Sequence, residues 1–302
     1  YPDFYPSFYP AFNPVVDVQA NNSNGPVSVA WNGSATLSWT SNDVSSCDAS
    51  GDWSGQKIPP ANSSESTGVL SQVKTYSYSL SCDSGAATDN VQINVTAPSP
   101  SAYSVTYSEP NYCTSGPGGF VAWSYSDPAG SAQASYQVQI DEQGSFQSPE
   151  YDSGQINSSS KVFSIPNGVL EFNNGYKARV RTWSALGGLS AWSNPTSTFN
   201  TPNYAYPQTA FTWTPTKPDK NVVVQFTDQT VFGGGNPNNR DWDWTFGDGG
   251  TSSQQNPTHT YTDLGTYTIL ETVTDAAGQS CSVSHSIKVQ KPSPFIKEVA
   301  PK

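Results

Sequence analysis

The sequence predicts an all-β protein of three tandem β-sandwiches, preceded by an extended arm rich in proline and aromatic residues. Only 34% of the 302 residues are hydrophobic, whereas Gly and Pro contribute 24 each, a composition typical of short strands joined by many turns. A chain of this length can bury two or three separate cores. No long stretch shows the 3.6-residue period of a helix, whereas several segments alternate polar and apolar residues, as half-buried strands do.

The arm, residues 1–14, repeats Tyr-Pro-x-Phe three times and ends in Asn13-Pro14. Proline at every fourth position fixes φ and removes an N–H donor, so we expect an extended segment of roughly 40 Å. Two interpretations stay open: a semi-rigid spacer, or an assembly arm that lies on a neighbouring molecule, since exposed aromatic rings otherwise limit solubility. The rings of this assembly arm are Tyr1, Phe4, Tyr5, Phe8, Tyr9 and Phe12.

Residues 15–98 are expected to form the first sandwich. Segments of period two mark its strands at 34–39, 76–82 and 91–95. The Leu-Ser-Trp strand, the Cys after it and the later Tyr-x-Leu-x-Cys strand resemble bacterial immunoglobulin-like domains. This resemblance implies a disulfide between Cys47 and Cys82 that bridges the two sheets or the strand ends. The order differs from that of antibody domains, because Trp39 precedes the first Cys.

Residues 103–202, after a Pro-rich boundary, are expected to form the second sandwich. Segments of period two mark its strands at 120–125, 136–140 and 176–183. The final Leu-Ser-Ala-Trp-Ser segment, residues 189–193, is expected to form the last turn and strand and resembles that of a fibronectin type III domain. This resemblance implies that Trp123, Tyr176 and Val180 are core residues.

Residues 207–290 are expected to form the third sandwich, which carries the most informative motif. Trp-Asp-Trp-Thr-Phe-Gly-Asp-Gly at 242–249, followed by Asn-Pro-Thr-His-Thr-Tyr at 256–261, resembles the signature of a PKD-type β-sandwich, a spacer and binding scaffold of extracellular proteins. The signature residues are Trp244, Phe246, Gly247, Asp248, Gly249, Pro257, His259 and Tyr261. Residues 291–302 follow as an extended tail.

The charge balance and the lengths of the apolar runs argue against nucleic acids and membranes as partners of this chain. With 13 Lys+Arg against 24 Asp+Glu, the net charge of −11 repels phosphate backbones and anionic lipid head groups. No apolar run is long enough to cross a bilayer. We therefore expect no nucleic-acid partner and no membrane span within this chain.

The four cysteines indicate an oxidising compartment. Their spacing fits neither a zinc site nor a CxxC redox motif, and their even number favours disulfides over the alternative of four free thiols. The first inter-strand loop of a sandwich lies opposite its N-terminus, whereas the turn before the last strand lies at the N-terminal end. Cys113 and Cys281 are therefore both expected at the junction of the second and third domains, either as a disulfide or as two separate thiols.

Residues with catalytic chemistry are sparse. The two histidines, His259 and His285, lie on predicted strands of the third domain and are expected to pack rather than to catalyse. Asp228, Asp243 and Asp248 are candidate calcium ligands, with hydrogen bonds to turn amides as the alternative for these acids. Apart from this calcium option, we expect no cofactor, and we expect no catalytic residue.

The chain resembles the multi-domain surface proteins of prokaryotes that combine immunoglobulin-like, fibronectin type III-like and PKD-type domains. The resemblance implies three tandem immunoglobulin-like β-sandwiches in a non-catalytic extracellular protein at the cell surface. A stalk, adhesin or filament subunit is expected, with residues 1–14 as the inter-subunit contact and with other copies of itself, other cell-surface proteins or glycans as partners. The alternative is a carbohydrate-binding or spacer region of a secreted glycoside hydrolase or protease, in which Trp53, Trp242 or Trp244 would stack on sugar rings.

Overall fold

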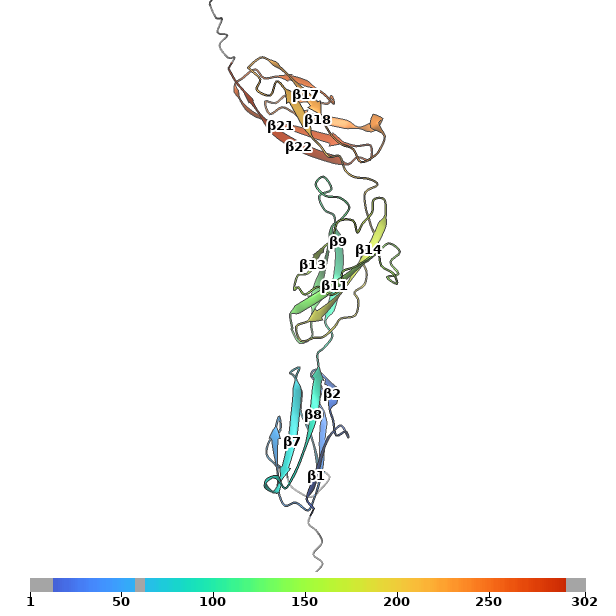
Figure 1. Ribbon diagram of the computed structural model, residues 1–302, viewed down its shortest axis with the longest axis vertical. Helices are drawn as coiled ribbons and strands as arrows, with labels where there is room; N and C mark the ends of the chain where they lie inside the picture. Colours follow the sequence, from blue (N-terminus) through green and yellow to red (C-terminus); the bar gives the residue numbers. More distant parts are fainter. Residues whose placement is uncertain (1–12, 58–62, 292–302) are drawn as a thin grey trace, which may run out of the picture.

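The computed structural model describes residues 13–57 and 63–291, which form three β-sandwiches placed end to end (Figure 1). The predicted fold class, an all-β chain of tandem sandwiches, is confirmed. The assembly-arm rings from Tyr1 to Phe12 and the tail from residue 292 lie outside the described residues.

The first sandwich packs a three-stranded sheet, ordered β1-β3-β6, against a five-stranded sheet, ordered β2-β8-β7-β4-β5. β2 pairs in parallel with β8, so the beginning and the end of this domain lie side by side. The strands are β1 (Val15–Ala20), β2 (Val27–Ala30), β3 (Thr36–Asn42), β4 (Cys47–Gly51), β5 (Gln56–Lys57), β6 (Ser63–Ser66), β7 (Thr75–Cys82) and β8 (Ala87–Thr96), with a 3₁₀ turn at Asp83–Gly85.

The disulfide of the first domain lies within one sheet. Cys47 is the first residue of β4 and Cys82 the last of β7, and the two are directly opposite each other in the ladder. Because β4 and β7 are hydrogen-bonded neighbours, the bond joins strand ends and does not bridge the two sheets, which was the other option.

The second sandwich packs a sheet ordered β13-β10-β9 against a sheet ordered β12-β11-β14-β15. The predicted core residues Trp123, Tyr176 and Val180 are buried, which confirms their assignment. The strands are β9 (Ser101–Ser108), β10 (Phe120–Ser126), β11 (Gln133–Asp141), β12 (Tyr151–Asp152), β13 (Val162–Ser164), β14 (Gly175–Ser184) and β15 (Phe199–Asn200).

The segment after β14 does not form the strand expected over 189–193; hydroxyl residues pair it with β14 instead. Each of three residues donates its N–H to a β14 carbonyl at 2.8–2.9 Å and accepts, through its side-chain oxygen, from the N–H of the same β14 residue at 2.9–3.0 Å. The pairs are Ser190 with Thr182, Ser193 with Val180, and Thr196 with Ala178. The three hydroxyl residues are spaced three positions apart along the segment, whereas their partners on β14 are spaced two positions apart. The segment is therefore not a regular strand, and its side-chain oxygens accept the β14 N–H bonds that the carbonyls of a neighbouring strand would accept.

We expect Ser193→Ala to lower the free energy of unfolding of the second domain by about 1–3 kcal/mol, because the buried N–H of Val180 loses its side-chain acceptor. Ser197 in the same segment is exposed, so Ser197→Ala is a matched control with an expected effect within about 0.5 kcal/mol. Urea unfolding measures both variants, and equal midpoints would contradict the role of the hydroxyl.

The third sandwich packs a sheet ordered β16-β17-β20 against a sheet ordered β19-β18-β21-β22. Its longest pairing joins β21 and β22 over ten residues of each strand. The strands are β16 (Phe211–Thr214), β17 (Val223–Asp228), β18 (Asp241–Thr245), β19 (Thr251–Ser252), β20 (Thr258–Thr260), β21 (Gly265–Thr274) and β22 (Ser280–Val289), with a 3₁₀ turn at Pro237–Asn239.

Candidate functional site

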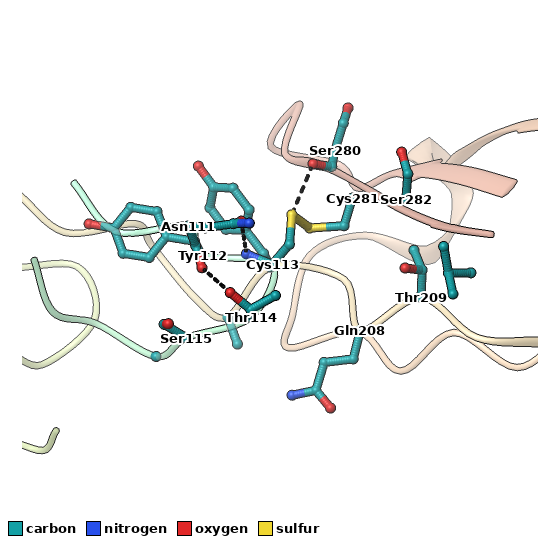
Figure 2. Close-up of a pocket in the computed structure, with 14 residues that line it drawn as sticks. Asn111, Tyr112, Cys113, Thr114, Ser115, Gln208, Thr209, Ser280, Cys281 and Ser282 are labelled. Atoms are coloured by element: carbon teal, nitrogen blue, oxygen red, sulfur yellow. Dashed lines mark hydrogen bonds between the residues drawn. A yellow bond between two sulfur atoms is a disulfide. The ribbon is translucent and has the colours of Figure 1, made fainter. Parts of the chain in front are cut away.

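The candidate site is the junction between the second and third domains, where a disulfide crosses from one to the other (Figure 2). Cys113 lies in the loop between β9 and β10, and Cys281 is the second residue of β22. Their Cα atoms are 5.6 Å apart, within the usual range for a bonded pair. All four cysteines of the chain are bonded, so the alternative of separate thiols does not apply in the structure.

The loop that carries Cys113 is anchored to its own domain by a turn and by a tyrosine pair. The side chain of Asn111 accepts a hydrogen bond from the N–H of Cys113 at 3.1 Å. The ring of Tyr112 is buried, its hydroxyl lies 3.1 Å from that of Tyr107, and the Tyr107 hydroxyl donates to the carbonyl of Gly118 at 2.7 Å. On the side of the second domain, the disulfide is thus attached to a loop whose position is fixed by hydrogen bonds and by the buried ring of Tyr112.

The linker between the two domains is attached on both sides. On the side of the second domain, the Tyr206 ring packs against Tyr112 with centroids 5.2 Å apart. On the side of the third domain, Gln208 and Val231 exchange backbone hydrogen bonds of 2.8 and 3.1 Å. Burial raises the pKa of Tyr112 and of Tyr206, so both hydroxyls stay protonated at neutral pH. The junction is therefore held by the linker and by the disulfide together.

A cavity of about 790 Å³ lies at this junction. Its lining residues carry hydroxyl, amide, aromatic and aliphatic groups, with no charged side chain among them. They come from the Cys113 loop, the linker and the start of β22, and Figure 2 shows several of them around the disulfide. Its titratable groups are the hydroxyls of Tyr112 and Tyr206, whose pKa values are raised, so this lining is suited to packing and to polar contacts.

The signature residues of the third domain lie in its core and in its turns. Trp244, Phe246 and Tyr261 are buried at 0–1% exposure. The His259 ring stacks on Phe246 with centroids 4.2 Å apart, and its Nε2 lies 2.7 Å from a carboxylate oxygen of Asp248. The remaining signature residues are the buried Pro257 and the positive-φ turn residues Gly247 and Gly249. The signature is therefore structural, and His259 packs as expected.

The structure does not bring the candidate calcium ligands together as one site. The Asp228 carboxylate accepts from the Trp242 indole at 2.9 Å and from the Gln255 amide at 3.0 Å. Asp248 accepts from His259 and from a turn N–H, while Asp243 is exposed on β18. Within residues 13–57 and 63–291, no three Asp, Glu, His or Cys side chains are grouped so that they could hold a metal ion.

Hydrogen bonds also set the pKa of these two acids. Burial acts to raise the pKa of Asp228 and of Asp248, but the hydrogen bonds that each carboxylate accepts bring its pKa below the ordinary value. Asp228 and Asp248 therefore stay ionised and hydrogen-bonded within the fold, in line with the non-metal interpretation of these acids.

Two of the three tryptophans suggested for sugar stacking are buried, which corrects that expectation for Trp53 and Trp244. Trp244 is fully buried, and Trp53 is 8% exposed with its ring edge-on to Trp39 at 5.2 Å. Trp242 is half-buried against the core of the third domain, and its indole N–H is used by Asp228. Trp242 and Trp244 lie on β18, whereas Trp53 lies in the loop between β4 and β5. Their burial depends on packing that the sequence motif alone does not show.

Sequence reasoning missed one chemically unusual residue, Glu271 on β21. Its side chain is fully buried between sheets, and neither carboxyl oxygen has a hydrogen-bond partner among the described residues. Burial raises its pKa to about 8, and the nearby charge of Asp228 adds to that shift. A signal was present, because Glu271 alternates with Ile269 and Val273 and so falls on the inward face.

Family comparisons agree with these structural assignments. Residues 205–290 match the family described as PKD domain. The third sandwich is a PKD domain. Residues 114–201 match the Rha78A-like, N-terminal immunoglobulin domain, whose sandwich architecture fibronectin type III domains share. The predicted combination of immunoglobulin-like, fibronectin type III-like and PKD-type domains is confirmed.

Similar stretches occur in bacterial proteins. Collagenase ColA of Bacillus cereus is 44% identical over 48 residues, which are 16% of this chain and 5% of that protein. Microbial collagenase of Vibrio alginolyticus is 41% identical over 46 residues, 15% of this chain and 6% of that protein. The solved PKD1 domain of Vibrio anguillarum Epp is 28% identical, covers 30% of this chain and 99% of its own, and has a TM-score of 0.26. The chain thus spans only a small part of the curated relatives that it matches.

These domain types are usually non-catalytic, and their combination with two disulfides indicates an extracellular protein. In the part of the chain that the structure describes, we find no helix with the length and apolarity needed to cross a membrane.

Proposed function

We propose that the chain is a non-catalytic stalk, adhesin or filament subunit at the cell surface, in which the domains keep a fixed end-to-end arrangement. The observation that carries this proposal is the Cys113–Cys281 disulfide between the second domain and the PKD domain. Domains joined by a linker alone normally move relative to each other. A second covalent connection beside the linker opposes such motion, which is useful in a rod that holds a binding surface away from the cell.

The partners in this proposal are other copies of the chain, other cell-surface proteins and glycans. The contact is supplied by residues 1–14, whose repeat presents six aromatic rings in twelve residues. Prolines would interrupt a hydrogen-bonded ladder, so these rings are expected to dock into grooves rather than to add a strand to a sheet edge.

We expect the full chain to form oligomers or fibres and the chain lacking residues 1–14 to stay monomeric. A third variant, in which the six arm aromatics are replaced by serine, keeps the length and the prolines and separates the effect of the rings from that of the spacer. Light scattering coupled to size exclusion measures the mass, and electron microscopy shows the shape. Rod-like monomers from all three would contradict the assembly role of the arm and favour a spacer.

A second candidate function is a spacer or carbohydrate-binding region of a secreted protease or glycoside hydrolase. The short matches to two bacterial collagenases favour the protease version. A catalytic domain encoded in the same reading frame beyond either end of this chain would support this candidate over the stalk.

A further inference from the structure

The position of the inter-domain disulfide along the chain has a mechanical consequence. Cys113 follows β9, the first strand of the second domain, and Cys281 is the second residue of β22, the last strand of the PKD domain. The bond spans 168 positions of sequence. Nearly all of both domains, residues 114–280, is therefore enclosed in one covalent loop.

We propose that the Cys113–Cys281 disulfide is a covalent shortcut that carries pulling force through the second domain and the PKD domain without unfolding either. Force that enters at Ser101 passes along β9 to Cys113, crosses the disulfide, and leaves along β22. This inference rests on the proposed function as a stalk or filament subunit, in which the ends of the chain are pulled apart.

The two strands on this path have little length left to release. β9 has eight residues and β22 has ten, and strands already rise about 3.3 Å per residue, close to the limit of an extended chain. β9 runs from the first domain toward the junction, and β22 runs from the junction toward the C-terminal end (Figure 1). β9 lies close to the long axis of the molecule, whereas β22 crosses it obliquely (Figure 1). Because force enters and leaves each strand at its two ends, tension loads both strands lengthwise and bypasses β10–β21.

The amount of chain protected in this way is large. At about 3.4 Å per residue, the 168 positions between the two cysteines would release roughly 570 Å if both domains unravelled. The first domain has a smaller loop, because Cys47 and Cys82 are 35 positions apart, which encloses roughly 120 Å of chain. Only residues 15–47 and 82–96 of that domain stay on the force path, with roughly 160 Å of contour.

Single-molecule force spectroscopy tests the shortcut on the full chain, held between marker domains at its two ends. The oxidised protein is expected to release at most roughly 160 Å of contour, all from the first domain. The double variant Cys113→Ser/Cys281→Ser keeps the other disulfide and should release roughly 570 Å more. The control Cys47→Ser/Cys82→Ser should release only roughly 120 Å more than the wild type.

Release of the long segment by the oxidised wild type would overturn the proposal, and so would equal extension of the wild type and the Cys113→Ser/Cys281→Ser variant. If that variant fails to fold, a thiol reductant is added during the pull to the folded Cys47→Ser/Cys82→Ser variant, in which Cys113–Cys281 is the disulfide left to reduce. The extra length must then appear only after reduction. The result does not depend on self-association, so failure of the arm to assemble and failure of the shortcut are separate outcomes.

Discussion

Glu271→Gln is expected to stabilise the PKD domain by up to about 3 kcal/mol at pH 7 and to leave its stability nearly unchanged at pH 4. Glu271 is fully buried beside Asp228, and burial together with that charge raises its pKa to about 8. The glutamine keeps the shape of the side chain but has no carboxyl proton to lose.

The direction of the pH dependence follows from proton binding. In the unfolded chain Glu271 loses its proton above its ordinary pKa of 4.5, whereas in the folded domain it keeps the proton up to about pH 8. Between these values the folded state binds more protons than the unfolded state, so the wild-type domain loses stability as the pH rises. Below pH 4.5 both states are protonated and the difference from the variant disappears.

Thermal unfolding of the wild type and of Glu271→Gln between pH 4 and pH 9 measures this effect. Asp243→Asn is the matched control, because Asp243 is an exposed acid of the same domain. Two results would show that ionisation of Glu271 does not limit stability. In the first, the melting temperature of Glu271→Gln exceeds the wild-type value by the same amount at pH 4 and at pH 8. In the second, it falls below the wild-type value at pH 8.

Gly247→Ala should destabilise the PKD domain by about 3 kcal/mol, from unfavourable backbone conformation and steric overlap together. Gly247 has a φ of 80°, and a Cβ there would lie 2.6 Å from the backbone oxygen and 2.8 Å from the backbone nitrogen of Thr268. Both neighbours are backbone atoms of β21, which cannot move without disturbing the ladder.

Gly249→Ala isolates the conformational part of this cost. Gly249 has a φ of 96°, but a Cβ there would meet no atom within 4 Å, so we expect a loss of about 1 kcal/mol. Chemical denaturation of the two variants gives the comparison. Equal losses would mean that the contact with Thr268 relaxes freely, in contradiction to the geometry.

Much of the fold follows from local pattern. Alternation of period two predicted the strands that carry Trp39, Trp123 and Tyr176, because it depends only on the geometry of a single strand. The turn glycines of the third domain were also predictable, since few residues other than glycine adopt their positive φ. The segment over 189–193 was predicted wrongly, because its hydroxyl groups replace the strand carbonyls that a local pattern assumes.

The sequence by itself determined the fold class, the number of sandwiches and the oxidising compartment, which depend on composition, strand period and cysteine content. Only the tertiary structure decided that Trp53 and Trp244 are covered, that Glu271 is buried without a partner, and that Cys113 meets Cys281. The period of a strand shows which side chains share a face, but not which face is covered. That depends on contacts between residues far apart in the chain, whose distances no local pattern specifies.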